Sequence, residues 1–329
     1  MTPGPCERSD ADPRLLPGYA RTFAEGRLTL GLAFPLGAGG GLSPDVDPGR
    51  QVALARAAEE GGIAALWARD IPLRVPSFGD VGQVYDPWVF LTHVAAHTNR
   101  IALGTAAVVL PVRHPLHVAK SAASLDRICG GRFLLGVALG DRPEEFRAFG
   151  LEQGERGERF REHLSVLRHA LTTEMRGVRW SGGWMHSADV VPKPTASSVP
   201  LVITGSSQQS MRYNAEHGDA WLTYPREFTA QRRAVAQWRG LVAEASGSVE
   251  ARKPFAQSLR VDLAEDPHEE ASPLTFGFRI GRRRLVAHLR ELEGIGVDHV
   301  VLGPASRTRS VDEVIDELAE HVVPHFPAG

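Results

Sequence analysis

Short apolar runs alternate along the chain with segments whose apolar residues recur every three or four positions. The runs predict eight strands, at residues 28–34, 63–68, 100–110, 132–139, 200–204, 220–224, 258–263 and 298–302. The recurring segments predict helices at residues 50–62, 87–98, 115–128, 156–171, 207–217, 227–245, 282–294 and 311–322. Strands that alternate with helices pair in parallel, and eight such units close into a (β/α)8 TIM barrel.

An open, doubly wound sheet is the main alternative to the barrel. It is disfavoured because no predicted strand is followed by G-x-G-x-x-G with an acidic residue downstream. We therefore expect one α/β domain, a (β/α)8 barrel at residues 27–325 with insertions in the loops of its C-terminal face. Residues 1–26 form an N-terminal leader that we expect to be extended or flexible. Barrel chemistry takes place in the loops that follow the strands, so candidate residues lie just past each apolar run.

The composition narrows the class of protein. The 329 residues are 43% hydrophobic and 23% charged, which is ordinary for a soluble globular protein, and the net charge of −2 gives no reason to expect nucleic acid as a partner. The longest apolar run, residues 101–112, is shorter than the roughly 20 residues that cross a bilayer. With two cysteines and no secretory signal, we expect a cytoplasmic protein without a disulfide framework or a membrane partner.

Three other catalytic classes are disfavoured. His93 and His97 have the i, i+4 spacing of a zinc helix, but the glutamate of H-E-x-x-H is missing, so we expect no metal site. A Schiff-base aldolase needs a lysine at a strand end, and Lys120, Lys193 and Lys253 do not follow predicted strands. The G-x-S-x-G elbow of a hydrolase does not occur.

A serine-rich segment follows the fifth predicted strand. Gly205 leads into Ser206, Ser207 and Ser210, where hydroxyl groups and the free N–H groups of a helix start would suit a phosphate. Glycine also lets an anion approach the backbone closely. Ser206 and Gln209 equally have the spacing of a capping box, which occurs at any helix start. The residues alone leave both interpretations open.

The end of the third predicted strand carries only small side chains. Thr105, Ala106 and Ala107 stand there, and they leave room for a flat, bulky group to lie against the backbone. The alternative is that they fill a tight layer inside the barrel. Hydrophobic periodicity does not separate the two interpretations.

One long segment indicates a protein family more specifically than either of these features does. Residues 103–150, LGTAAVVLPVRHPLHVAKSAASLDRICGGRFLLGVALGDRPEEFRAFG, closely resemble the bacterial luciferase-like flavin monooxygenases. The matching features are the Thr-Ala-Ala strand end, the Pro and His-Pro after it, the Leu-Asp before Gly-Gly-Arg-Phe, and the final Phe-Gly. Residues 205–221 and 276–302 also fit, so the resemblance covers about residues 27–325.

The resemblance implies a barrel oxidoreductase that usually works as a homodimer. Members of the family use reduced FMN and oxygen. Our first hypothesis is therefore a monooxygenase that acts on a small organic substrate and receives reduced FMN from a separate flavin reductase. In one branch a deazaflavin coenzyme replaces FMN and no oxygen is used, so deazaflavin-dependent hydride transfer is the second hypothesis. The third is a non-catalytic flavin-binding protein.

The resemblance also implies which residues hold the cofactor. Ser206, Ser207 and Ser210 fall where the family binds the flavin phosphate. Ala106 and Ala107 fall beneath the flavin ring, where the family often has a non-proline cis peptide bond. The cofactor-binding residues expected from these matches are Thr105, Ala106, Ala107, Gly205, Ser206, Ser207 and Ser210.

The chain departs from the luciferases after the second predicted strand. They carry a catalytic histidine there, whereas this chain has Arg69 and Asp70, so we do not expect light emission. The two residues either form an ion pair that closes the barrel mouth, or Arg69 faces an anionic substrate or the flavin. Leu139 stands where the luciferases place a phosphate-binding arginine, and Arg142 is the candidate to replace it.

Three further residues complete the set of catalytic candidates. His114 matches a family position, and histidine is the usual acid or base near neutral pH, with a purely structural role as the alternative. Tyr224 and Arg226 follow the sixth apolar run and point toward the mouth as substrate contacts. The candidate catalytic residues are Arg69, Asp70, His114, Tyr224 and Arg226.

Overall fold

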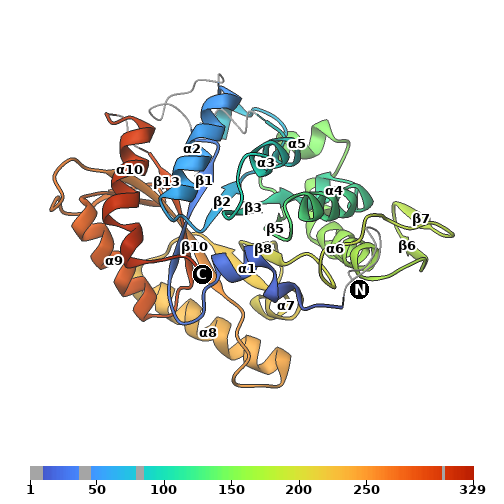
Figure 1. The fold of residues 1–329 in the computed structure, drawn as a ribbon. Helices are drawn as coiled ribbons and strands as arrows, with labels where there is room; N and C mark the ends of the chain where they lie inside the picture. The colour runs from blue at the N-terminus through green and yellow to red at the C-terminus, as the bar shows by residue number, and fades with distance from the viewer. Residues whose placement is uncertain (1–9, 37–45, 79–84, 306–307) are drawn as a thin grey trace.

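Parallel strands close into a barrel that is covered on its outside by helices (Figure 1). A computed structural model describes residues 10–36, 46–78, 85–305 and 308–329. Around the barrel the strands follow the order β1-β2-β3-β5-β8-β9-β10-β13, and β13 pairs with β1 to close it. Each of these eight strands leads into a helix on the outside, so the predicted (β/α)8 barrel is confirmed.

The bounds of the elements agree with the hydrophobic pattern to within a few residues at most ends. The barrel strands are β1 (Thr29–Phe34), β2 (Ala65–Ala68), β3 (Ala102–Thr105), β5 (Phe133–Ala138), β8 (Leu201–Thr204), β9 (Ala220–Thr223), β10 (Phe255–Leu263) and β13 (His299–Pro304). The helices that follow them are α2 (Pro48–Glu60), α3 (Pro87–Ala95), α4 (Pro115–Ile128), α6 (Arg156–Thr172), α7 (Met211–His217), α8 (Phe228–Ser246), α9 (Arg282–Gly294) and α10 (Val311–His321).

The prediction of residues 100–110 as one continuous strand is wrong. The chain forms β3, then β4 (Val108–Val109), and then the short helix η3 (Leu110–Val112). Gly104 pairs with Leu134, and Val108 pairs with Val137. The segment from Gly104 to Val108 therefore advances by four residues while β5 advances by three. One extra residue therefore bulges out of the strand, which a hydrophobic pattern does not reveal.

The interior of the barrel is filled by both small and large buried side chains. Trp67 lies there among buried alanines, which are Ala65, Ala102, Ala220 and Ala256. A Cβ atom on Gly31 would lie 2.6 Å from Nε2 of His299 and 2.8 Å from Nε1 of Trp67. Glycine is required at position 31 because the two rings occupy that space. A larger apolar layer lies between the strands and the helices.

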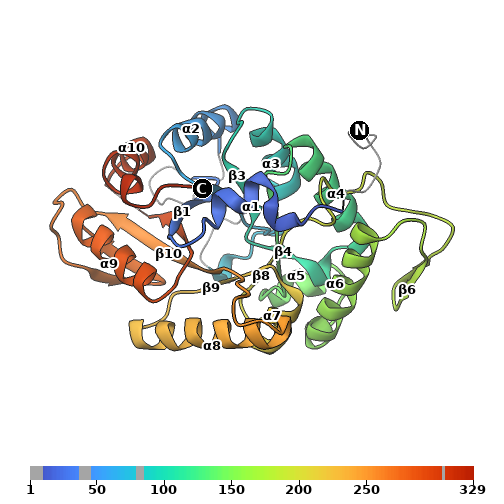
Figure 2. The same cartoon turned by 60° about the horizontal axis from the view of Figure 1, so that its bottom comes forward.

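The N-terminal segment closes the end of the barrel opposite the strand carboxyl ends. It forms η1 (Pro13–Leu15) and α1 (Pro17–Thr22), and α1 lies across the end of the barrel (Figure 2). Tyr19 and Phe23 pack into the interior cluster, and the Tyr19 hydroxyl donates to the carbonyl of Asp219 at 3.1 Å. Residues 1–9 of the predicted leader lie outside the described residues.

Insertions modify the basic pattern at three places. The helix α5 (Pro143–Ala148) and the short helix η4 (Gln153–Glu155) lie between β5 and α6. An antiparallel hairpin, β6 (Val178–Trp180) and β7 (Gly183–Met185), projects from the connection between α6 and β8. After β10 the chain forms β11 (Ser272–Leu274) and β12 (Gly277–Ile280), and β12 pairs in parallel with the end of β10. Short helices η2 (Pro76–Phe78) and η5 (Val323–His325) complete the fold.

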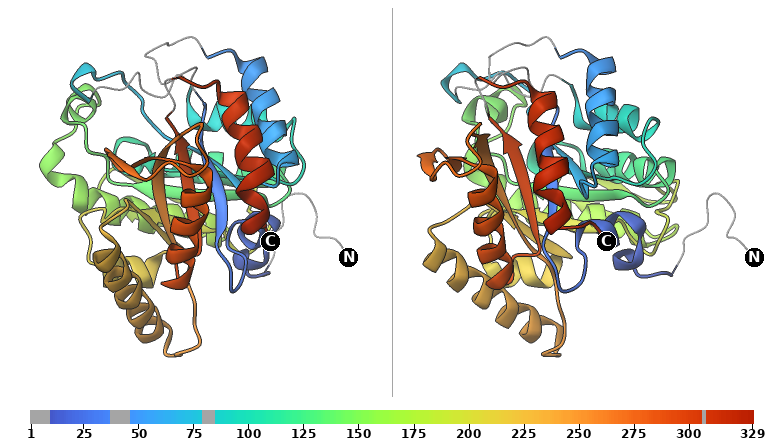
Figure 3. Two further views of the ribbon diagram at one scale, coloured as in Figure 1. Left: turned by 90° about the vertical axis from the view of Figure 1, so that its left-hand side faces the viewer. Right: turned by 60° about the vertical axis from the view of Figure 1, so that its left-hand side comes forward.

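On the outside of the barrel α10 lies next to α2 (Figure 3), and Arg282 at the start of α9 forms an ion pair with Glu317 of α10 at 2.8 Å. The C-terminus lies against α1, where the Gly329 amide donates to the Arg21 carbonyl at 3.1 Å. Within the described ranges, none of the helices has both the length and the apolar character that crossing a membrane requires.

Candidate active site at the barrel mouth

The carboxyl ends of the strands meet at one end of the barrel, and most of the predicted site residues lie there. Arg69 follows β2, Thr105 ends β3, and Gly205 and Tyr224 follow β8 and β9. Loops in this position form the active sites of (β/α)8 barrels. His114 differs from the others because it is the N-cap residue of α4, outside the ring of strands.

Small residues form the floor of the mouth at the end of β3. The peptide bond between Ala106 and Ala107 is cis, as the family resemblance led us to expect. The Thr105 hydroxyl donates to the Gly136 carbonyl at 2.8 Å and accepts from the Gly136 amide at 2.9 Å. A Cβ atom at Gly136 would lie 1.7 Å from the Thr105 carbonyl oxygen. Thr105 therefore joins β3 to β5 directly beside the two alanines.

The serine segment after β8 begins its helix later than predicted. The Ser210 hydroxyl oxygen accepts from the Tyr213 amide at 3.1 Å, so Ser210 is the N-cap and α7 begins at Met211. The proposed capping box of Ser206 and Gln209 is therefore wrong. Because the Ser210 oxygen accepts from Tyr213, its own proton is available to donate to a ligand.

Residues 205–209 form a tight turn at the mouth, which we call the serine elbow. Gly205, Ser207 and Gln208 all have positive φ angles, of 64°, 49° and 52°. The amide of Gln209 donates to the Ser206 carbonyl at 2.8 Å. The amides of Ser206, Ser207 and Gln208 donate to no acceptor among the described residues. Successive free amides in such a turn form a concave site that suits an anion.

Two further features leave room and polarity at the elbow. A Cβ atom at Gly205 would have no neighbour within 4 Å among the described residues, and the buried Thr204 hydroxyl has no hydrogen-bond partner there. Ser207, which is only 4% exposed, donates its hydroxyl to the Thr204 carbonyl at 3.1 Å. Ser207 therefore holds the turn in shape, while Ser206 is exposed to a ligand.

The elbow rests on the first turns of α6. The Gln209 side-chain N–H group donates to the Gly157 carbonyl at 3.0 Å. The Oε1 atom of Gln209 accepts from the Arg161 guanidinium at 3.1 Å. Trp221, at the second position of β9, donates its indole N–H to the Gly205 carbonyl at 2.7 Å. Arg161 thus places a positive charge beside the elbow. No local pattern in the sequence marks this residue.

Asp70 forms a buried ion pair whose partner the sequence did not predict. Both carboxylate oxygens accept from the Arg113 guanidinium at 2.7 Å, and one also accepts from the Val109 amide at 3.1 Å. Arg113 also donates to Asp86, the N-cap of α3, at 2.7 Å. Asp70 therefore ties the loop after β2 to β4 and to the start of α3. Arg113 lies 43 residues away in sequence, and no local pattern marks the pair.

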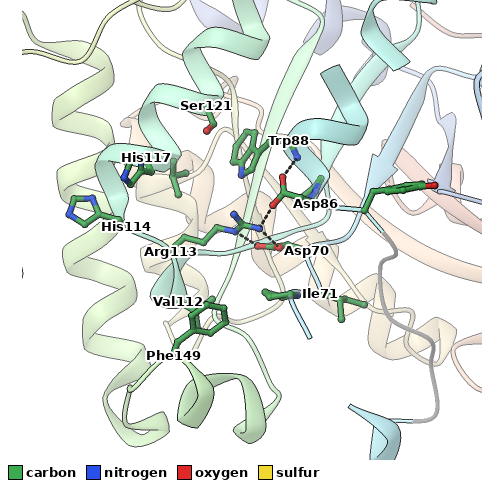
Figure 4. A pocket seen from close by; sticks show the side chains of 14 residues that line it. Asp70, Ile71, Asp86, Trp88, Val112, Arg113, His114, His117, Ser121 and Phe149 are labelled. Atoms are coloured by element: carbon green, nitrogen blue, oxygen red, sulfur yellow. Dashed lines mark hydrogen bonds and ion pairs between the residues drawn. The ribbon is translucent and has the colours of Figure 1, made fainter. Parts of the chain in front are cut away.

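This ion pair borders a cavity of about 620 Å³ between α3 and α4 (Figure 4). Its wall includes Trp88, His117 and His114, and the His114 ring also contacts Trp180 at 5.7 Å between centroids. The Nδ1 atom of His114 accepts from the Leu116 amide at 3.3 Å, which caps α4. Burial, together with the neighbouring His117 and Arg159, lowers the pKa of His114. The structure therefore places His114 and Asp70 beside this cavity.

The residues after β9 brace one another. Arg226 donates to the Thr223 hydroxyl at 3.0 Å and to the Gln231 side chain at 3.1 Å, and its guanidinium lies over the Trp221 ring at 5.5 Å. Tyr224 is 57% exposed and stacks on Phe276, a residue from the insertion after β10. Arg226 thus supports the segment that carries Tyr224. Only the fold brings Phe276 to this position.

Comparisons with known proteins agree with this geometry. The sequence pattern of the family described as luciferase-like monooxygenase matches residues 28–318. The 4-hydroxyprotoasukamycin monooxygenase of Streptomyces nodosus subsp. asukaensis is 29% identical over 295 residues, which cover 85% of this chain and 78% of that protein. The F420-dependent hydroxymycolic acid dehydrogenase of Mycobacterium tuberculosis is 31% identical over 221 residues, or 65% of this chain and 58% of that protein. The solved structure of the monooxygenase RslO1 from Streptomyces bottropensis has the same fold, with a TM-score of 0.75 and 21% identity over 90% of this chain and 99% of its own.

Proposed function

The chain belongs to the family of luciferase-like monooxygenases, and from this premise we propose that it uses reduced FMN and oxygen to oxidise a small organic substrate. Both relatives named above are oxidoreductases, one a monooxygenase and one a dehydrogenase, so the chain is assigned to the oxidoreductase enzymes. The hypothesis of a non-catalytic flavin-binding protein is not retained.

The serine elbow is the observation that carries this proposal. A phosphate there would accept from the free amides of Ser206 and Ser207 and from the hydroxyls of Ser206 and Ser210. Arg161, which contacts the elbow through Gln209, adds a favourable charge. The dipole of α7 adds little, because this helix has only 7 residues.

The other residues of the mouth would orient the ring of the cofactor and keep water away from it. Ala106 and Ala107 would lie beneath the flat ring of the cofactor, as the family resemblance implies. Phe34 and Trp221, each 3% exposed, pack instead in the apolar layer between the strands and the helices, where they support the strand ends from outside. When bound, reduced FMN would supply the electrons for oxygen chemistry, and the protein would bind, orient and shield it.

Deazaflavin-dependent hydride transfer is the second candidate function. The similarity to an F420-dependent dehydrogenase supports it, since that relative's name states a deazaflavin coenzyme. Such a coenzyme also has a flat ring and a phosphate, so the same elbow and floor would serve it. This enzyme would turn over without oxygen.

Ligand titration of the apo-protein distinguishes these candidates. FMN, riboflavin and the F420 coenzyme, each oxidised and reduced, would be titrated while tryptophan fluorescence is followed, because Trp221 touches the elbow. Tighter binding of reduced FMN than of reduced riboflavin supports the proposal. Preference for F420 supports hydride transfer. Absence of binding by all three would overturn both.

We further propose that the enzyme is a cytoplasmic homodimer, with a single barrel domain at residues 27–325, that depends on a separate flavin reductase. The chain has no G-x-G-x-x-G segment after a predicted strand with which to bind a nicotinamide coenzyme. The purified chain should therefore oxidise NADH with FMN no faster than the buffer does, and it should have the mass of two chains by light scattering. A monomer, or NADH oxidation by the chain alone, would contradict these points.

A further inference from the structure

Two half-exposed aromatic rings stack on each other at the rim of the barrel mouth. The centroids of Tyr224 and Phe276 are 4.7 Å apart and their planes differ by 21°. Tyr224 is 57% exposed and Phe276 is 54% exposed. Tyr224 follows β9, whereas Phe276 precedes β12 in the insertion after β10. We call this pair the aromatic rim.

Regular structure holds Phe276 in place. Its φ angle is 62°, and its carbonyl accepts from the Arg260 amide of β10 at 2.9 Å. A Cβ atom on the next residue, Gly277, would lie 1.7 Å from the Arg260 carbonyl oxygen, so the two backbones are in direct contact. The β12 strand then pairs with β10 from Gly277 onward. Phe276 thus lies in the turn between β11 and β12, and its backbone is fixed beside β10.

Ion pairs fasten the rest of the insertion. Arg279 in β12 bridges Asp262 of β10 at 3.1 Å and Glu269 at 2.8 Å. The Gly281 amide donates to the Glu269 carbonyl at 3.0 Å, which ties the end of β12 to the same turn. The aromatic rim is therefore preorganised before any ligand arrives.

Tyr224 directly follows β9, at the end of the barrel where the strand carboxyl ends meet. In the strand order, β9 stands four places from β2, which is the opposite side of the eight-strand barrel. Burial and the Asp141 carboxylate nevertheless raise the pKa of Tyr224, while Arg69 after β2 and Arg142 act in the other direction.

A second ring lies near the same charged group. Phe78, at the end of η2, is 42% exposed, and the Arg142 guanidinium lies over its ring at 4.9 Å from the centroid. Exposed single aromatic residues are common, but a stacked and fixed pair beside the carboxyl ends of the barrel strands is not explained by packing.

We propose that the aromatic rim is a stacking platform that selects a planar, aromatic substrate for this enzyme. This inference deepens the proposed function and rests on it, because it names the substrate class of the same mouth. A ring that slides onto the exposed face of Phe276 or Tyr224 gains an offset-stacked contact in addition to the burial of its area. A saturated ring of the same size gains only the burial.

The test compares two probes with the same carbon skeleton and carboxylate, planar aromatic 2-naphthoate and its saturated, non-planar analogue decahydro-2-naphthoate. Calorimetric titration of the full chain, with and without FMN, should show about tenfold tighter binding of 2-naphthoate, the equivalent of one good stacking contact. Phe276→Leu and Tyr224→Leu should each reduce that preference to less than about threefold. Phe276→Tyr and Tyr224→Phe keep the rings and should preserve it.

Trp184→Leu is the matched control, because Trp184 is 58% exposed on the β6–β7 hairpin, away from the mouth. It should leave both affinities unchanged. Equal binding of the two probes by the unmodified chain, no binding of 2-naphthoate, or an unchanged preference in Phe276→Leu would overturn the proposal. If FMN binds normally but 2-naphthoate is not preferred, only the proposed stacking platform is refuted. If 2-naphthoate is preferred but FMN does not bind, the proposed cofactor is refuted and the stacking platform is supported.

Discussion

The indole N–H of Trp67 donates to Nε2 of His299 at 3.0 Å in the interior of the barrel. Nε2 must therefore be the acceptor, and the imidazole proton is on Nδ1, which faces the Thr29 hydroxyl at 2.7 Å. That hydroxyl in turn donates to the Thr22 carbonyl of α1. One chain of hydrogen bonds thus connects β2, β13, β1 and the helix that closes the barrel.

This arrangement predicts a loss of stability in acid. Complete burial lowers the pKa of His299 to about 3, from an ordinary value of 6.5. The folded chain therefore keeps the ring neutral, whereas the unfolded chain protonates it below pH 6.5, so the stabilisation is complete above that pH and is lost as the pH falls toward 3. Between pH 6.5 and pH 5 the loss should be about 2 kcal/mol.

Urea unfolding at several pH values tests this, with His299→Gln as the non-titrating variant. The variant should be less stable at pH 7 but should lose less stability than the natural chain between pH 7 and pH 5. An identical pH dependence in both proteins would show that His299 does not cause the loss.

Ser210 offers a test of the phosphate site that leaves the helix intact. Asparagine and aspartate both cap helices well, so Ser210→Asn and Ser210→Asp should retain α7. Aspartate adds a negative charge where the phosphate would bind, so it should weaken FMN binding about tenfold or more relative to asparagine. Riboflavin has no phosphate and should bind both variants alike. Equal FMN affinity in the two variants would contradict the proposal that the FMN phosphate binds at the elbow.

Breaking the buried ion pair should destabilise the mouth. Asp70→Asn leaves Arg113 without half of its charge pairing, and we expect the free energy of unfolding to fall by about 2–3 kcal/mol. Asp312→Asn is the matched control, because Arg50 and Asp312 form an equally short pair, at 2.6 Å, whose side chains are 50% and 54% exposed. It should cost less than about 0.5 kcal/mol. Denaturant unfolding measures both, and similar losses would contradict the structural importance of Asp70.

The close contact between Gly136 and the Thr105 carbonyl predicts that a larger residue at position 136 strongly destabilises the protein. Gly136→Ala would place a Cβ atom 1.7 Å from the Thr105 carbonyl oxygen, so β3 and β5 would have to separate. We expect a loss of about 3 kcal/mol or more in stability, together with weaker flavin binding. Gly154→Ala is the control, since its Cβ would meet no described atom within 4 Å and its φ angle is not positive. Thermal unfolding that does not distinguish the two variants would refute the close contact.

The eight strand–helix units could be predicted from the sequence, because hydrophobic periodicity is a local property that each segment carries by itself. The positions of the serine elbow and of the Ala106–Ala107 floor could be predicted as well, from two separate stretches that resemble a known family. The exact ends of the strands and helices were harder to predict from the sequence. The bulge that divides β3 from β4, and the start of α7 at Met211, depend on pairing and capping between neighbours.

The tertiary structure alone decided which distant side chains meet. Asp70 pairs with Arg113, and Tyr224 stacks on Phe276, although neither pair shares a strand, a helix or a local motif. The partner of a charged or aromatic side chain depends on which loops the closed barrel brings to the same part of its rim. That closure is a property of all eight strands together, so no local stretch of sequence contains it.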